Sequence, residues 1–152
     1  MSHVLSYGNP KTSYTQQMAQ ERKLIINISA SKDSFGAFAE NCSGIYAQGD
    51  SVREVKQDVY DAIQLFKEFN PESEWPEPIK ENWPIEWHYD TQSLLLYYQG
   101  IFTNAALERL TGINQKQLWN YANGVSKPRK QAKEKIENAL HTLGHELLEL
   151  SL

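Results

Sequence analysis

Residues 103–128 read TNAALERLTGINQKQLWNYANGVSKP, and their spacing predicts two short helices joined by a tight turn. Apolar side chains recur along both segments, at Ala105, Ala106, Leu107 and Leu110 in the first and at Leu118, Trp119, Tyr121 and Ala122 in the second. Gly112 suits a turn that requires a positive φ, and Asn114 is a favourable N-cap for the second helix. Closed by Gly124 and Pro128, this is the pattern of a helix-turn-helix unit.

The second predicted helix exposes a face of amides and one lysine. Such groups hydrogen-bond base edges and phosphates, which is the chemistry of a recognition helix in a major groove. The base-reading candidates are Asn114, Gln115, Lys116, Gln117 and Asn120. Trp119 has two interpretations, packing in the core or stacking near a DNA backbone, whereas Leu118 and Tyr121 are predicted core residues.

The net charge of -4 conceals an uneven distribution of charge along the chain. Residues 1–90 carry 8 Lys and Arg against 14 Asp and Glu, whereas residues 91–152 carry 7 against 5. Lys127, Arg129 and Lys130 follow the second predicted helix, where a loop would meet backbone phosphates. The basic patch therefore suits nucleic acid, and the acidic half suits a basic partner.

Upstream, the sequence predicts a flexible leader over residues 1–22 and a small α/β domain over residues 23–90. A β-prone run begins at Leu24, and turn residues separate it from two further strands, at 35–39 and 45–48. Together these segments predict a three-stranded meander.

Ser51 and Glu54 have the spacing of a capping box that opens a helix over residues 52–69. Its apolar residues lie on one face and are predicted to cover the sheet: Val55, Val59, Ala62, Ile63, Phe66 and Phe69. Residues 70–84 hold four of the six prolines and are predicted to form an extended connection rather than regular structure. Residues 85–89 are then predicted to return to the sheet as a fourth strand.

Residues 91–152 are predicted to form an all-α domain that contains the helix-turn-helix unit. A strongly apolar helix starts at Thr91 and is expected to pack beneath the two short helices. A last helix over residues 129–150 ends in more leucines than one small domain needs, which indicates a dimer contact.

The sequence offers little for catalysis, and no catalytic residue, metal ligand or cofactor site is predicted. His141 and His145 lie four residues apart with Glu137 one turn earlier, but a solvated helix face is the preferred interpretation over a metal site. The single cysteine, Cys42, is interpreted as a small, partly buried side chain near a turn. No apolar run approaches the ~20 residues needed to cross a bilayer, so a cytoplasmic protein is expected.

Residues 35–51, FGAFAENCSGIYAQGDS, resemble the sheet signature of HicB-type antitoxins. The match is carried by Gly44, Gln48, Gly49, Asp50 and Ser51. Glu40 and Ser43 stand where the family usually has prolines in the intervening turn. The C-terminal half is similar to the helix-turn-helix of the Cro and phage-repressor type, in which an Asn-Gly pair and a later proline follow the recognition helix. Asn123, Gly124 and Pro128 hold those positions.

The resemblance implies an α+β protein, in which a β-β-β-α-β partial RNase H-like domain precedes an all-α helix-turn-helix domain. It implies a catalytically inactive antitoxin that masks a basic, mRNA-cleaving HicA toxin and, as a dimer, represses its own operon at double-stranded operator DNA. By position, the residues implied to contact phosphates are Thr103, Ser126, Lys127, Arg129 and Lys130. Two rivals stay open, a free-standing repressor whose N-terminal domain senses a small molecule and an active nuclease that uses acids such as Asp33.

Overall fold

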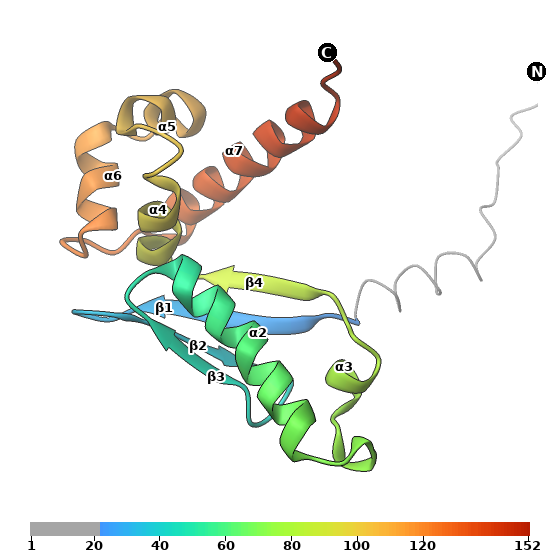
Figure 1. Ribbon diagram of the computed structural model, residues 1–152. Helices are drawn as coiled ribbons and strands as arrows, with labels where there is room; N and C mark the ends of the chain where they lie inside the picture. The colour runs from blue at the N-terminus through green and yellow to red at the C-terminus, as the bar shows by residue number, and fades with distance from the viewer. Residues whose placement is uncertain (1–21) are drawn as a thin grey trace, which may run out of the picture.

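A computed structural model describes residues 22–152 (Figure 1). The predicted leader, apart from Arg22, lies outside the described residues. The described chain is a mixed α and β structure that combines a four-stranded mixed sheet with six α-helices. We refer to residues 22–90 as the sheet half and to residues 91–152 as the helical half.

The sheet has the order β3-β2-β1-β4. Strands β1 (Leu24–Ala30), β2 (Phe35–Ala39) and β3 (Tyr46–Gly49) form an antiparallel meander, as predicted, with β3 displaced by one residue from the predicted 45–48. Strand β4 (Ile85–Tyr89) lies beside β1 and parallel to it. The chain therefore crosses over one face of the sheet between β3 and β4.

Helix α2 (Val52–Phe69) makes this crossover and covers one face of the sheet, in front of the strands in Figure 1. Side chains alternate between faces along a strand, and in β1 the buried set is Leu24, Ile26 and Ile28. These residues pack with Val55 and Val59 of α2 in one hydrophobic core. The opposite face of the sheet carries polar side chains such as Asn27 and Gln48 together with the exposed rings of Phe38 and Tyr46.

The predicted capping box opens α2 with one difference. Ser51 Oγ accepts a hydrogen bond from the Glu54 amide at 3.1 Å. The Glu54 carboxylate, however, accepts from the Asp50 amide at 2.8 Å, one residue before the cap. Gly49 lies directly below this turn, where an added Cβ would be 2.8 Å from Glu54 Cβ and 3.0 Å from the Val55 nitrogen. Glycine at position 49 therefore allows β3 to end against the first turn of α2.

We expect Gly49→Ala to destabilise the protein by about 1–3 kcal/mol, because the methyl group overlaps backbone that the capping bonds hold in place. Thermal unfolding followed by circular dichroism measures the effect. Gly36→Ala is the matched control, since its added Cβ meets only the Ala47 oxygen, at 3.9 Å. Equal melting temperatures for the two variants would contradict this explanation of the glycine.

The expectation that residues 70–84 lack regular structure is wrong. A 3₁₀ helix, η1 (Glu72–Glu74), and a short α-helix, α3 (Glu77–Lys80), lie in this segment. Pro71 and Pro76 occupy the N-cap positions of these helices, where no backbone N–H is required. The prolines therefore start helices here rather than prevent them.

The apolar stripe predicted for α2 is also wrong at its last position. Phe69 is 80% exposed, whereas Phe66 packs against the core. Phe69 is the last residue of α2 and lies toward one flank of the apolar stripe.

The helical half consists of α4 (Thr91–Tyr98), α5 (Asn104–Thr111), α6 (Gln115–Ala122) and α7 (Lys130–Leu148). A second hydrophobic core unites these helices through six buried residues: Leu95, Leu107, Leu118, Tyr121, Ala122 and Ile136. Figure 1 shows α7 running beyond the other helices toward the C-terminus. None of the helices in residues 22–152 is both long enough and apolar enough to cross a membrane.

Helix α4 joins the two halves. It packs beneath α6, as predicted, and it also contacts β1, β4 and α2. Lys56 of α2 lies in this junction, with its ammonium 4.8 Å from the ring centroids of Trp87 and Tyr97 and 5.3 Å from that of Tyr89. Burial lowers the pKa of Lys56, and the rings compensate for part of the lost hydration through cation–π attraction. Helix α4 contacts α6 on one side and the sheet half on another, which explains why it is apolar around most of its circumference.

Candidate nucleic-acid interface

Helices α5 and α6 are held by a short, fully capped turn. Thr103 Oγ1 accepts from the Ala106 amide at 3.1 Å and caps α5, which ends at Gly112 in the left-handed conformation with φ 71°. Asn114 Oδ1 accepts from the Lys116 amide at 2.8 Å and caps α6. The predicted turn role of Gly112 and the predicted N-cap role of Asn114 are confirmed.

A carboxylate from α5 connects the two helices directly. Glu108 accepts a hydrogen bond from the Gln115 amide at 3.0 Å. This amide is one of the free N–H groups at the positive end of α6, so a carboxylate is favoured there. The link fixes the start of α6 relative to α5.

The faces of α6 divide into a buried and an exposed set. Leu118 and Tyr121 are buried, as predicted. Gln115 and Lys116 are exposed at the N-terminal end of the helix. Trp119, which the sequence left between two interpretations, is 50% exposed on the outer face. The outer face of α6 thus combines an amide, an ammonium and an aromatic ring, and the exposure of Trp119 favours the surface interpretation over the core one.

The other candidates of α6 also support the loop that follows. Gln117 is half-buried, and its side-chain amide donates to Ser126 Oγ at 3.1 Å. The Asn120 carbonyl accepts from the Val125 and Ser126 amides at 2.9 and 3.4 Å. Gln117, Asn120 and Ser126 are therefore partly engaged within the protein, whereas the side chains of Gln115 and Lys116 are exposed.

The loop after α6 leads directly into a cationic helix start. Lys127, Arg129 and Lys130 are exposed, and Arg129 is the N-cap of α7. No acidic residue lies in the first turn of α7, although a helix N-terminus favours negative charge. Lys130 has one acidic neighbour, Glu134, at 3.8 Å. Cations at the positive end of a helix do not stabilise the helix, but such an arrangement is suited to binding an anion.

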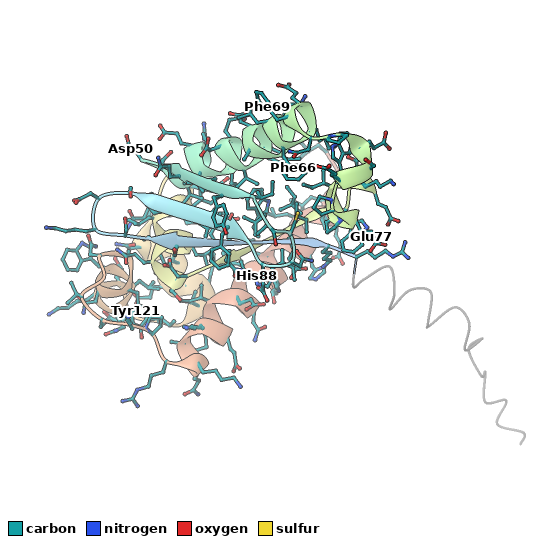
Figure 2. All side chains as sticks on the ribbon, turned by 90° about the horizontal axis from the view of Figure 1, so that it is seen from below. Asp50, Phe66, Phe69, Glu77, His88 and Tyr121 are labelled. Carbon is teal, nitrogen blue, oxygen red and sulfur yellow. The ribbon has the colours of Figure 1, made fainter. Side chains whose placement is uncertain are left out.

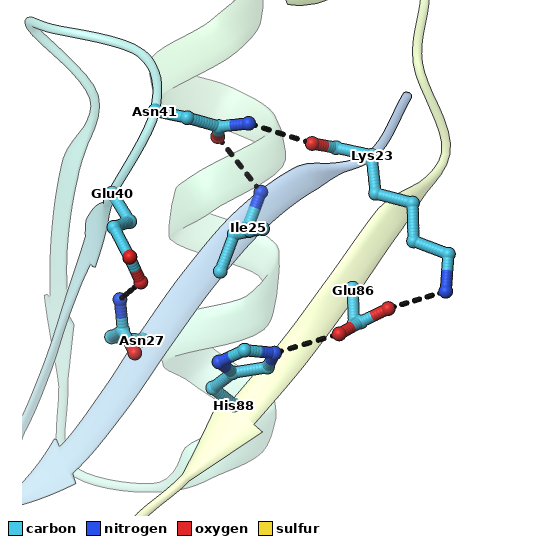
Figure 3. A network of polar contacts seen from close by, with 7 residues as sticks. All are labelled: Lys23, Ile25, Asn27, Glu40, Asn41, Glu86 and His88. Carbon is cyan, nitrogen blue, oxygen red and sulfur yellow. Dashed lines mark hydrogen bonds and ion pairs between the residues drawn. The ribbon is translucent and has the colours of Figure 1, made fainter. Parts of the chain in front are cut away.

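A cavity of about 770 Å³ lies between β4, α4 and α7. Its lining mixes apolar side chains such as Leu94 and Tyr98 with the polar side chains of Glu86, His88 and His141. Figure 3 shows that Glu86 lies between Lys23 and His88. The Glu86 carboxylate accepts a hydrogen bond from the Lys23 ammonium, and its Oε1 is 2.7 Å from His88 Nε2. Hydrogen bonds from Lys23 and then His88 hold the pKa of Glu86 below its usual range. The cavity therefore combines apolar surface with ionisable side chains, as small-molecule sites do.

Within the described residues, the histidines of α7 and Cys42 do not come together as ligands for a metal ion. His141 and His145 are exposed, and within residues 22–152 no three His, Cys, Asp or Glu side chains are grouped as metal ligands. Cys42 is more deeply buried than expected, at 4% exposure in the turn before β3, and burial raises the pKa of its thiol.

The chain matches no protein-family model, no curated protein and no solved structure, so no function is transferred to it from a relative.

Proposed function

We propose that this protein is a HicB-type antitoxin: a cytoplasmic, non-enzymatic protein that neutralises a HicA-type mRNA-cleaving toxin and represses its own operon. The observation that supports this most is the outer face of α6. Gln115 and Lys116 project from a capped α5–α6 pair, and the cationic start of α7 follows in the chain. A rigid helix with amides and a cation at its N-terminal end has the properties needed in a major groove.

The sheet half supports the toxin-binding part of the proposal. Apart from the short helices η1 and α3 between α2 and β4, its element order is the β-β-β-α-β expected of a partial RNase H-like domain. The resemblance around Gly49 and Ser51 coincides with the close approach of β3 to the capped start of α2. The excess of Asp and Glu in residues 1–90 suits a basic toxin.

In the proposed DNA complex, base edges are read from α6 and phosphates are held by its surroundings. The base-reading set is Asn114, Gln115, Lys116, Gln117 and Asn120. The phosphate set is Thr103, Ser126, Lys127, Arg129 and Lys130, to which we add the ring of Trp119. A dimer would place two α6 helices in half-sites roughly 34 Å apart, or a multiple of that, so the operator should be an inverted repeat.

Fluorescence anisotropy with the duplex that precedes the coding sequence tests the DNA-binding part. At fixed salt, we expect binding tighter by about 10³-fold or more than to a shuffled duplex of equal length and composition. Equal affinity for both duplexes would remove α6 as a sequence reader.

Lys127→Ala and Arg129→Ala should each weaken binding to all sequences. Each should also make the negative slope of log K against log salt shallower by about 1. The physical reason is that each variant releases one fewer counterion from the DNA. Titrations at several salt concentrations measure the slope. Lys32→Ala, an exposed lysine in the turn between β1 and β2, is the control and should leave the slope unchanged. If neither Lys127→Ala nor Arg129→Ala changes the slope, the phosphate contacts lie elsewhere.

The cavity between β4, α4 and α7 favours a second candidate, a free-standing repressor that senses a small molecule. Both halves line this cavity, so a ligand there could alter how they are joined. A gene for a short basic protein beside this one favours the antitoxin, and its absence favours the sensor. Metal-dependent RNA cleavage by the purified chain, abolished by Asp33→Asn, would instead establish the nuclease rival.

A further inference from the structure

The exposed surface of α2 is divided by charge into two flanks. One flank, which we call the acidic flank, has the helical spacing of four acids and two apolar residues: Glu54, Asp58, Asp61, Leu65, Glu68 and Phe69. The basic residues of α2, Arg53, Lys56 and Lys67, occur at other angular positions. The acidic flank therefore presents negative charge and apolar surface without any cation of its own.

Contacts within the sheet half locate this flank. Asp58 accepts a hydrogen bond from the Gln48 amide of β3 at 2.9 Å, so the acidic flank lies over the β3 edge of the sheet. On the other side of α2, Tyr60 packs edge-on against Trp87 of β4, with ring centroids 6.0 Å apart. Lys56 on that side also contacts Tyr97 of α4. The acidic flank is thus on the side of α2 remote from the junction with the helical half.

The carboxylates of the acidic flank are not neutralised within the described chain. Their hydrogen-bond donors are uncharged: backbone amides serve Glu54 and Asp58, and the side-chain amides of Gln57 and Gln64 serve Asp61 and Glu68. None of the ion pairs found in residues 22–152 involves these four acids. The full negative charge is therefore available to an external partner.

Two apolar side chains lie among these carboxylates without packing against the core. Leu65 is 53% exposed and Phe69 is 80% exposed, one helical turn apart. Figure 2 shows Phe69 at the margin of the molecule, on α2. One exposed apolar residue needs no explanation, but an adjacent pair ringed by charge has the composition of a protein interface. The chain continues into η1, where Glu72 and Glu74 add further acids.

We propose that the acidic flank of α2 is the surface on which the basic toxin docks, with Phe69 and Leu65 as its apolar anchors. The partner is a protein that brings lysines and arginines against the four carboxylates and receives the Phe69 ring in an apolar pocket. From Glu54 to Phe69 the flank runs about 22 Å along the helix, a length that suits one side of a standard-size interface. This inference rests on the proposed antitoxin function.

The position of the flank has a consequence for regulation. Because it lies on the β3 side of α2, a docked toxin would leave α4 and the outer face of α6 uncovered. Toxin and operator could then be bound by the same chain at the same time.

Isothermal titration calorimetry tests the proposal with the purified basic protein encoded beside this chain as the probe. We expect Phe69→Ala to weaken binding by about 30-fold or more, as truncation of an interface anchor does. Glu68→Lys combined with Asp61→Lys should weaken binding and reduce the dependence of the affinity on salt concentration, because attractive charge pairs with a basic partner are lost. Tyr46→Ala is the control, because Tyr46 is an equally accessible aromatic residue, 72% exposed on the open face of the sheet, and it should bind as the wild type does.

The outcomes separate this inference from the function on which it rests. Wild-type binding that is unchanged in Phe69→Ala and in the charge-reversal variant would overturn the docking surface and leave the antitoxin function standing. No binding by the wild type would overturn both. A Phe69→Ala variant that becomes monomeric in light scattering would show that a second copy of the chain occupies the flank, which also overturns the proposal. All substituted side chains are exposed, so the variants should fold. Circular dichroism spectra identical to that of the wild type would confirm this.

Discussion

Leu147→Asp combined with Leu148→Asp should convert a dimeric chain into a monomer and lower operator affinity by about 10²–10⁴-fold. Leu147 is 55% exposed and Leu148 is 84% exposed at the end of α7, beyond the helices that bury Ile136. An exposed run of leucines at a helix end is suited to pairing with a second copy. In a dimer, binding of the first α6 helix holds the second near its own half-site, so that the second binds at a high effective concentration. A monomer lacks this gain in affinity.

Analytical ultracentrifugation gives the oligomeric state, and anisotropy with the inverted repeat gives the affinity. Ile101→Asp is the matched control, because Ile101 is 67% exposed in the loop between α4 and α5 and lies outside α7. The control should remain dimeric. A double α7 variant that sediments as the wild type does would exclude the end of α7 as the dimer contact.

Gln115→Ala and Lys116→Ala should each lower sequence-specific affinity by about 1–3 kcal/mol if a bidentate base contact is lost. Both side chains are exposed, and the hydrogen bond between the Gln115 amide and Glu108 uses the backbone, which the substitution retains. For Gln115→Ala, binding to a shuffled duplex should change much less than binding to the operator, because this substitution removes no charge. Gel-shift titrations at fixed salt on both duplexes measure the difference.

Leu118→Ala provides the contrast within the same helix. Leu118 is 1% exposed, and its truncation should destabilise the fold by about 2–5 kcal/mol. The two surface variants should retain the wild-type melting temperature. If both still bind the operator as tightly as the wild type does, α6 is not the reading helix.

Local sequence patterns predicted the elements whose ends are set by capping. Ser51 and Glu54 located the start of α2, and Asn114 and Gly112 located the turn between α5 and α6, because caps act through residues only a few positions apart. The short β4 strand was also predicted at its observed bounds.

Features that depend on distant parts of the chain were missed or predicted wrongly. The prolines of residues 70–84 were interpreted as breakers, although Pro71 and Pro76 precede helices and Ile79 of α3 enters the core. The parallel pairing of β4 with β1 and the contacts of α4 with the sheet half could not be inferred from periodicity.

The candidate site was predicted in outline but not in detail. The spacing of Leu118 and Tyr121 identified the buried face of α6, whereas a tryptophan suits either a core or a surface, so the exposure of Trp119 needed the structure. The acidic flank of α2 was hidden because Phe69 was assigned to the core stripe. Contacts between distant residues, such as the hydrogen bond from the Gln48 amide to Asp58 and the packing of Tyr60 against Trp87, place the flank over β3 and away from the helical half.

We propose that the sheet half neutralises a toxin while the helical half controls its synthesis. Colony counts of cells that express the neighbouring basic protein, alone or together with this chain, test it most directly. We predict that the basic protein alone arrests growth, that co-expression restores it, and that the two proteins co-purify. Continued growth arrest, with both proteins present in the soluble fraction and no co-purification, would contradict the account.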